Sequence, residues 1–301
     1  MTDLRVRVPA TSANLGPGFD AFALALPMVA EFEVRAAHRW SVTVDGAGEG
    51  IPIGEDNLFV IGARAAAKAI GSALPPQHIT QRSAIPLGRG LGSSAAAIVG
   101  GVTAANALLG EPLGRRALLR VAAEVEGHGD NVAAALYGAF TVAVPHGEGP
   151  VAVRIAFPAT WRVCLLVPAD VLATEKARGV LPAQVSRTDA VFNLAHASAL
   201  VAAVLRSDGA LLRVAMQDRL HQAARARLVP TLEDVSRAAC DAGAFGAALS
   251  GAGPAVLAIA PARLAARVIG AMEEASALAG VPARGRVVRV RAAGAQLHRA
   301  S

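Results

Sequence analysis

A glycine-rich segment with the sequence Pro86-Leu-Gly-Arg-Gly-Leu-Gly-Ser-Ser-Ala-Ala-Ala97 runs directly into a pattern of small apolar residues. Glycine permits positive φ angles and lets a backbone approach a ligand closely. The first N–H groups of a helix attract anions. We therefore predict a phosphate-binding turn, although a tight turn with serines that cap a helix stays an alternative. The spacing of the glycines matches neither the P-loop of nucleoside triphosphatases nor the glycine fingerprint of dinucleotide-binding folds.

A second segment, Glu126-Gly-His-Gly-Asp-Asn-Val132, carries titratable groups at alternate positions. Carboxylate oxygens together with nucleotide phosphates suit Mg²⁺. A transition-metal site made of Glu126, His128 and Asp130 is the alternative interpretation. The chain has two cysteines, Cys164 and Cys240, so a disulfide framework or a cysteine-based zinc site is excluded.

Hydrophobic patterning predicts the elements that must position these groups. The mixture of strands and helices without regular alternation indicates an α+β protein. Asp56 is expected to cap the first helix and Pro261 to open the last. Strands are predicted at about 4–8, 32–34, 41–44, 79–85, 140–144, 151–157, 163–167, 245–249, 255–259 and 284–290, and helices at about 57–70, 93–109, 115–125, 174–180, 188–205, 210–217, 232–242 and 261–279.

The 301 residues suggest two domains at roughly 150 residues each, and we place the boundary between about 144 and 161. With 53% hydrophobic and 17% charged residues, disorder is excluded. The net charge of +6 comes from scattered arginines, and no basic run with interleaved aromatics predicts a nucleic-acid partner. Residues 91–110 are uncharged but rich in small residues, so we expect a buried helix and no membrane span. Since the N-terminus lacks a signal-peptide pattern, we predict a cytoplasmic protein.

Two further motifs extend the pattern: Pro9-Ala-Thr-Ser-Ala-Asn-Leu-Gly-Pro-Gly-Phe-Asp20 and Phe245-Gly-Ala-Ala-Leu-Ser-Gly-Ala-Gly-Pro254. Together with the glycine loop they resemble the GHMP kinase superfamily of small-molecule kinases. The segment 126–132 resembles the Glu-Gly-His-Pro-Asp-Asn-Val signature of the homoserine kinases in that superfamily. Thr174-Glu-Lys-Ala-Arg178 and His221-Gln-Ala-Ala-Arg225 fit the same family, and the resemblance spans residues 5 to about 259.

The resemblance implies an α+β, two-domain GHMP kinase fold. An ATP-binding domain like domain 2 of ribosomal protein S5 would cover residues 1–155, and a ferredoxin-like domain would cover 156–301. It also implies ATP-dependent phosphorylation of the hydroxyl of L-homoserine to O-phospho-L-homoserine, a step of threonine biosynthesis, with Mg²⁺ as cofactor. Members of the family are often dimers, so a homodimer is an expectation as well.

The resemblance further assigns roles to residues. Asn131 would orient the substrate hydroxyl with Asp130 close to it, and Asp130 as a general base is the weaker hypothesis. Glu126 and Ser93 would hold Mg²⁺, with Glu124 as the fallback carboxylate. Asp20 and Asp130 would bind the ammonium group of the substrate. Thr174, Arg178 and Arg225 would bind its carboxylate, and Asn14 and His128 would complete the lining of the pocket. The adenine of ATP would contact Asn57. The phosphates of ATP would contact the glycine loop and the start of the following helix, at Pro86, Leu87, Gly88, Arg89, Gly90, Leu91, Gly92, Ser93, Ser94, Ala95 and Ala96.

The chain departs from the family pattern in three places. Arg89 stands where a small residue is usual, and we expect it to face solvent rather than the phosphates. Gly129 replaces a proline. No lysine precedes Lys68, so the lysine–aspartate dyad of several GHMP kinases is missing and positioning must dominate the chemistry. The alternatives are a GHMP kinase for another alcohol (mevalonate, a sugar or shikimate) and a ligand sensor without catalysis, whereas a serine hydrolase finds no Gly-x-Ser-x-Gly elbow.

Overall fold

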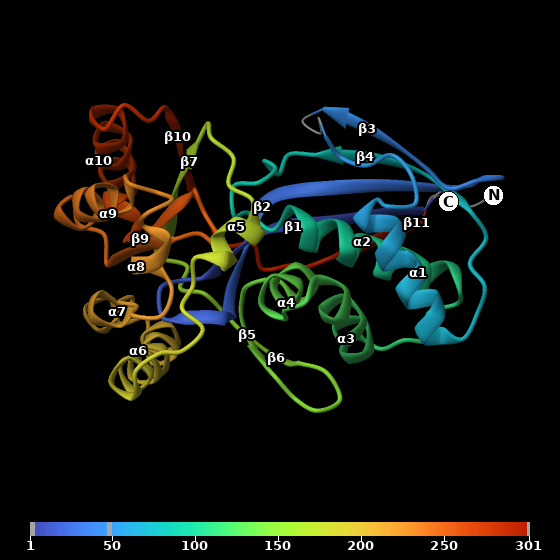
Figure 1. Cartoon of the computed structure of the whole chain (residues 1–301), viewed down its shortest axis with the longest axis horizontal. Coiled ribbons are helices and arrows are strands. Elements are labelled where there is room, and N and C mark those ends of the chain that lie inside the picture. The colour runs from blue at the N-terminus through green and yellow to red at the C-terminus, as the bar shows by residue number, and fades with distance from the viewer. Residues whose placement is uncertain (1–3, 47–49, 300–301) are drawn as a thin grey trace.

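The structure is a computed structural model that describes residues 4–46 and 50–299, and its described strands form two sheets at opposite ends of the molecule (Figure 1). The first sheet has the order β11-β1-β2-β4-β3, with β5 paired to β2 and β6 to β5. Its pairs are antiparallel except for β3 with β4. The members are β1 (Leu4–Asn14), β2 (Gly18–Ala36), β3 (Ser41–Gly46), β4 (Gln77–Ser83), β5 (Phe140–Val144), β6 (Val151–Ile155) and β11 (Gln296–Arg299).

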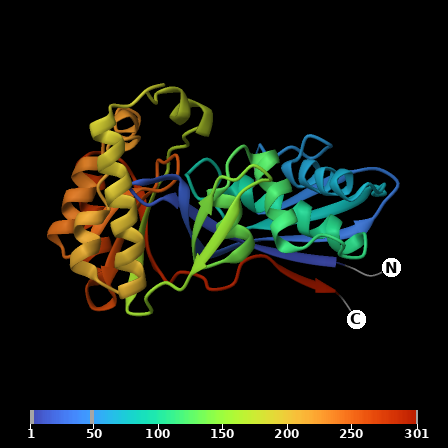
Figure 2. The same cartoon turned by 90° about the horizontal axis from the view of Figure 1, so that it is seen from below.

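Helices cover one face of this sheet, as Figure 2 shows for the cyan and green segments above the blue strands. Along β1, Val6 and Val8 are buried, whereas Arg5 and Arg7 alternate with them and pair with Glu31 on the exposed face. This alternation is expected of an antiparallel sheet with one solvated side. The covering helices are α1 (Leu58–Ile70), α2 (Ser93–Leu108), α3 (Arg115–Glu126) and α4 (Asp130–Tyr137). Because most of α2 is buried in this layer, the expectation of a buried helix within 91–110 is confirmed.

The second sheet has the order β10-β7-β9-β8 and is antiparallel throughout. Its strands and its helices α9 and α10 follow one another as β-α-β-β-α-β, which is the ferredoxin-like arrangement. Cys164 and Leu166 face α9 and α10, whereas Val163 and Leu165 face α6 and α7 on the other side. The elements are β7 (Trp161–Pro168), α5 (Thr174–Gly179), α6 (Arg187–Arg206), α7 (Gly209–Ala215), α8 (Gln222–Arg225), α9 (Leu232–Asp241), β8 (Gly246–Leu249), β9 (Val256–Pro261), α10 (Ala265–Leu278) and β10 (Ala283–Val288).

The two halves exchange segments. The turn between β1 and β2 reaches the second half, where Asn193 donates to the carbonyl of Pro17 (3.3 Å) and the ring of His221 bonds the carbonyl of Gly16 (2.8 Å). The chain after β10 then returns to the first sheet as β11, the red strand beside the blue ones in Figure 2. The predicted domain boundary between residues 155 and 156 stays a prediction, and it did not include the return of the chain to the first sheet as β11.

Several local expectations were wrong. The side chain of Asn57, not Asp56, caps α1 by accepting from the N–H of Phe59 (2.8 Å). Pro261 ends β9, and a 3₁₀ turn at Ala262–Leu264 precedes α10. The predicted strands did not include β11 or the full length of β2, and no helix was predicted at α4 or α8. The elements β11, α4 and α8 are short, so periodicity marks them weakly, and Pro27 interrupts β2 within the part that was not predicted.

Helix α6 is long and apolar enough to cross a membrane by length and composition alone, with a mean hydropathy of 1.4. It is weak evidence for a membrane because core helices of soluble proteins meet the same criteria. Its exposed apolar residues include Val191, Leu194 and Leu205.

Candidate active site

A cavity of about 600 Å³ lies where the glycine loop, the α3–α4 connection, the β1–β2 turn and α5 meet. It brings together nearly all of the residues that the sequence singled out. Ala95 and Ala96 are the exceptions: both are buried inside α2, and the N–H of Ala96 is donated to the carbonyl of Gly92. The predicted residues that line the cavity are Asn14, Asp20, Asn57, Pro86, Leu87, Gly88, Arg89, Gly90, Leu91, Gly92, Ser93, Ser94, Glu126, His128, Asp130, Asn131, Thr174, Arg178 and Arg225.

The glycine loop is held by its carbonyl groups. The carbonyl of Gly88 accepts from the N–H of Leu172, that of Gly90 from the hydroxyl of Ser250, and that of Leu91 from the N–H of Thr11. Among the described residues, no N–H of the loop or of the first three residues of α2 has a bond to protein outside its own helix. These N–H groups stand at a helix N-terminus, so the loop can receive a phosphate.

Glycine is required in this loop because neighbouring segments approach the backbone. Gly90 has a φ of 70°, and a Cβ there would lie 2.0 Å from the carbonyl oxygen of Ser250. Gly92 has a φ of 67°, and a Cβ there would lie 1.8 Å from Oγ1 of Thr11. The first and third motifs thus clamp the loop between them.

Arg89 does not face solvent, contrary to the expectation. Its guanidinium donates to the carbonyls of Leu87 (2.5 Å), Pro168 (3.2 Å) and Ala169. Pro168 is the last residue of β7 and Ala169 follows it, so both carbonyls lie at the end of this strand. Arg89 therefore ties the glycine loop to the second half of the molecule.

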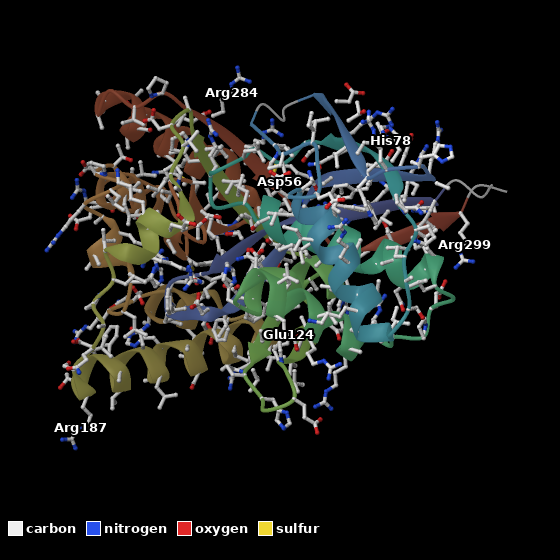
Figure 3. The ribbon with its side chains drawn as sticks, turned by 45° about the vertical axis from the view of Figure 1, so that its right-hand side comes forward. Asp56, His78, Glu124, Arg187, Arg284 and Arg299 are labelled. Carbon is white, nitrogen blue, oxygen red and sulfur yellow. The ribbon has the colours of Figure 1, made fainter. Side chains whose placement is uncertain are left out.

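Glu126, the last residue of α3, projects into the cavity and accepts a hydrogen bond from Oγ of Ser94 at 2.6 Å. The sequence paired Glu126 with Ser93, but the first turn of α2 points the hydroxyl of Ser94 at this carboxylate. Burial raises the pKa of Glu126, and the Ser94 bond opposes that shift. A carboxylate and a hydroxyl are hard oxygen donors, so this pair fits Mg²⁺. Glu124 is excluded as the fallback: its side chain is 68% exposed beside Arg120 and lies at the surface in Figure 3.

His128, Asp130 and Asn131 form a hydrogen-bonded group at the start of α4. Oδ1 of Asp130 accepts from Nδ1 of His128 (2.6 Å), from the backbone N–H of Asn131 (2.6 Å) and from Nδ2 of Asn131 (3.3 Å). Burial by itself lowers the pKa of His128, but the Asp130 bond and the nearby carboxylates raise it overall. Among residues 4–46 and 50–299 no group of three His, Cys, Asp or Glu side chains could hold a metal, so the transition-metal alternative gains no support.

Asp20 and Arg178 form a bidentate ion pair across the cavity, with N–O distances of 2.7 and 3.0 Å. Asp20 adopts a φ of 54°, a conformation that aspartate and asparagine tolerate better than most residues. The side chain of Asn14 accepts from the N–H of Asp20 (3.1 Å) and donates to the carbonyl of Gly251 (2.9 Å). Hydrogen bonding to Asp20 raises the pKa of Arg178. The two groups assigned to opposite ends of the substrate thus neutralise each other in this structure.

Arg225 is 2% exposed. Its Nε donates to the carbonyl of Ala177, and its Nη1 bonds the carbonyl of Gly251 and Nδ1 of His221. These bonds use two of its three nitrogens, and none of these partners is a carboxylate. Burial lowers its pKa, with the neighbouring Arg178 adding to the shift. A buried guanidinium with only neutral partners favours an anionic ligand.

Comparison with known proteins agrees with this geometry. The family model of the GHMP kinase N-terminal domain matches residues 57–139, and that of the GHMP kinase C-terminal region matches 200–277. The chain is 42% identical over 293 residues to the homoserine kinase of Desulfitobacterium hafniense, which covers 97% of this chain and 99% of that relative. It is 47% identical over 253 residues to the homoserine kinase of Deinococcus radiodurans, covering 84% and 82%. The chain belongs to the homoserine kinase family of GHMP kinases.

Solved structures show the same relationship. The homoserine kinase of Cytophaga hutchinsonii superimposes with a TM-score of 0.89 at 32% identity, covering 98% of this chain and 97% of that one. The mevalonate kinase of L. major shares the fold, with a TM-score of 0.69 at 17% identity and coverage of 95% of this chain and 96% of that one. The expected two-domain GHMP kinase fold is therefore confirmed.

Sequence reasoning missed residues that support the site from behind. Thr11 contacts Asn131, His221 contacts Arg225, and the hydroxyls of Ser12 and Ser250 bond each other at 2.7 Å. All four lie inside motifs that the homoserine kinase resemblance had already marked. The available signal was a buried polar side chain in an otherwise apolar strand or loop, because such a group needs a partner.

Proposed function

We propose that this chain transfers the γ-phosphoryl group of ATP to the side-chain hydroxyl of L-homoserine, forming O-phospho-L-homoserine for threonine biosynthesis. One observation carries the proposal: a single cavity joins a phosphate-binding loop to a buried guanidinium and an acid–base ion pair. A nucleotide and a zwitterionic amino acid need these two kinds of surface. Family membership supports the same reaction, because the most similar relatives described above are homoserine kinases.

The substrate would be held at its charged end. Arg225 offers its unused nitrogen to the carboxylate, and Thr174 lies in the same lining. Arg178 and Asp20 would give up their ion pair, so that Arg178 binds the carboxylate of the substrate and Asp20 binds its ammonium group. This exchange conserves the number of charge-assisted bonds, so binding need not leave a charge unpaired.

ATP would enter with its phosphates on the glycine loop and its adenine near Asn57. The capping bond to Phe59 and the bond from Nδ2 to the carbonyl of Pro52 (2.7 Å) fix the amide of Asn57. Glu126 and Ser94 would hold the magnesium ion of MgATP. When bound, this ion neutralises charge that develops on the phosphates.

The transfer itself requires alignment more than covalent help. The substrate oxygen bonds to the γ-phosphorus as the bond to the bridging oxygen of ADP breaks, and the hydroxyl proton passes to a phosphoryl oxygen. Asn131 would orient the hydroxyl. Oδ1 of Asp130 accepts from His128 and from two nitrogens of Asn131, so this carboxylate holds the Asn131 amide in place, which supports a positioning role for it.

The decisive experiment measures ADP release with MgATP and L-homoserine, beside mevalonate, galactose, shikimate and L-threonine, with ³¹P NMR of the product. Selective turnover of L-homoserine is expected. Selective turnover of another alcohol would retain the kinase and overturn the substrate assignment. Binding of MgATP without turnover of any substrate would favour the sensor instead.

The remaining expectations are a cytoplasmic homodimer that uses neither nucleic acid nor membrane. The scattered arginines and the family resemblance support them. Light scattering should give a mass above the 30.4 kDa of one chain. Sedimentation with anionic vesicles should leave the protein in the supernatant, and a pellet would contradict the expectation.

A further inference from the structure

Thr11 lies in β1 beneath the glycine loop and is completely buried. Its hydroxyl donates to Oδ1 of Asn131 at 2.7 Å, and its N–H donates to the carbonyl of Leu91 at 3.0 Å. It does not line the cavity, whereas Asn131 does. One residue therefore connects the phosphate loop to the side chain nearest the expected reaction.

The Asp130 carboxylate, which only accepts, decides which way the amide of Asn131 points, and the Thr11 hydroxyl holds the amide in that orientation by donating to its oxygen. With Oδ1 against Thr11, Nδ2 lies 3.3 Å from Oδ1 of Asp130. The reversed amide would place its oxygen against that carboxylate and its nitrogen against the hydroxyl, losing one favourable contact and adding an acceptor–acceptor contact. The observed orientation leaves the second hydrogen of Nδ2 for a ligand.

We propose that Thr11 is a positioning residue for phosphoryl transfer, which holds the Asn131 amide with its nitrogen available to the substrate hydroxyl. This inference rests on the proposed function. The Thr11 hydroxyl and the Asn131 amide are both uncharged, so this pair orients the substrate hydroxyl without accepting its proton. Crowding strengthens the constraint, because the space above Oγ1 of Thr11 is closed by the backbone of Gly92.

The test compares T11V, which replaces the hydroxyl by a methyl group of similar size, with T11S, which keeps the hydroxyl. The expected result for T11V is a fall in kcat of about tenfold, with the KM for ATP changed by less than about twofold, since loss of one buried hydrogen bond is of this size. T11S should restore kcat to within about threefold of wild type.

T103V is the matched control. Thr103 lies in α2, and its buried hydroxyl has no hydrogen-bond partner among the described residues. Removing that hydroxyl should leave kcat at the wild-type value. A double mutant completes the design: in an N131A background, T11V should lower kcat no further, because Thr11 acts through Asn131.

Equal kcat for T11V and wild type would overturn the positioning role, as would an undiminished effect of T11V in the N131A background. Wild-type protein without L-homoserine turnover would overturn the proposed function, and the positioning role with it. The two failures are distinguishable, because the first requires an active wild-type enzyme.

Discussion

At the scale of single residues, hydrogen bonds and side-chain direction determine which of two similar residues near each other in the chain belongs to the site. Two adjacent serines begin α2, but only Ser94 bonds Glu126, which is 32 positions away in the chain. Similarly, Glu124 and Glu126 occupy the same helix, but only Glu126 lines the cavity. A helix turns by 100° per residue, so a shift of one or two positions removes a group from the site.

Alanine at Ser94 should therefore lower kcat more than alanine at Ser93, by about tenfold or more, because only Ser94 contacts the carboxylate assigned to magnesium. E126Q should abolish most turnover, and E124Q is its matched control with near-wild-type rates. Turnover rates of the four variants at saturating MgATP and L-homoserine test these expectations. A larger loss in S93A would restore the original pairing of Ser93 with Glu126.

His221 gives a prediction for pH. Burial lowers its pKa below the ordinary 6.5, although the nearby Asp218 opposes this. As the pH falls below 6.5, the unfolded chain takes up a proton that the folded chain resists, so stability is lost by up to about 1.4 kcal/mol per pH unit. H221Q removes this contribution. The fall in Tm between pH 7.5 and 5.5 should be smaller in H221Q than in wild type.

H38Q provides the control, because it removes an exposed histidine. An equal fall in Tm for wild type and H221Q would show that His221 does not contribute to the acid sensitivity.

At the scale of elements, three segments from different parts of the chain hold the glycine loop in place. Thr11, Leu172 and Ser250 each donate to one of its carbonyls, and Arg89 adds bonds to the end of β7. The loop is thus oriented before ATP arrives, and pre-organisation lowers the entropy cost of binding.

G90A tests this packing. The new Cβ would meet the carbonyl oxygen of Ser250 in a backbone that alanine disfavours, so we expect destabilisation of about 3 kcal/mol or more and loss of ATP binding. G110A is matched, because Gly110 also has a positive φ (87°) but nothing lies within 4 Å of its Cβ position. It should cost about 1–2 kcal/mol. Chemical denaturation measures both, and equal losses would show that the contact with Ser250 is unimportant.

At the scale of the whole molecule, the two halves are joined by exchanged segments. The β1–β2 turn brings Asn14 and Asp20 to the second half, and β11 carries the C-terminal part of the chain back to β1. Figure 2 shows both crossings. The substrate site therefore needs the two halves in one fixed arrangement.

Deletion of residues 296–301 should lower the Tm by several degrees, because it removes β11 and exposes an edge of the first sheet. The single variant R299A loses only the exposed ion pair with Glu111 and a long bond to a carbonyl, and should stay within about 0.5 kcal/mol of wild type. Calorimetry of the two proteins decides this. An unchanged Tm on deletion would mean that β11 adds little to stability.

Much of the site followed from the sequence because motifs record local chemistry. The glycines of 88–92, the carboxylate of Glu126 and the arginines 178 and 225 were identified from residue type and spacing, or from the family resemblance, and they meet in one cavity. Residues alternate at the start of β1, and α3 and α9 carry their apolar residues on one face, so these elements were predictable from periodicity. In contrast, β7 and α2 were recognisable as continuous apolar runs.

Tertiary structure alone decided the pairings: Ser94 rather than Ser93 beside Glu126, Arg89 on the carbonyls of β7, and Thr11 behind Asn131. It also decided that β11 returns to the first sheet. Hydrogen bonds between residues far apart in the chain depend on the angle and depth at which elements pack. Periodicity fixes the face of an element that is buried, but not the partner that it meets there.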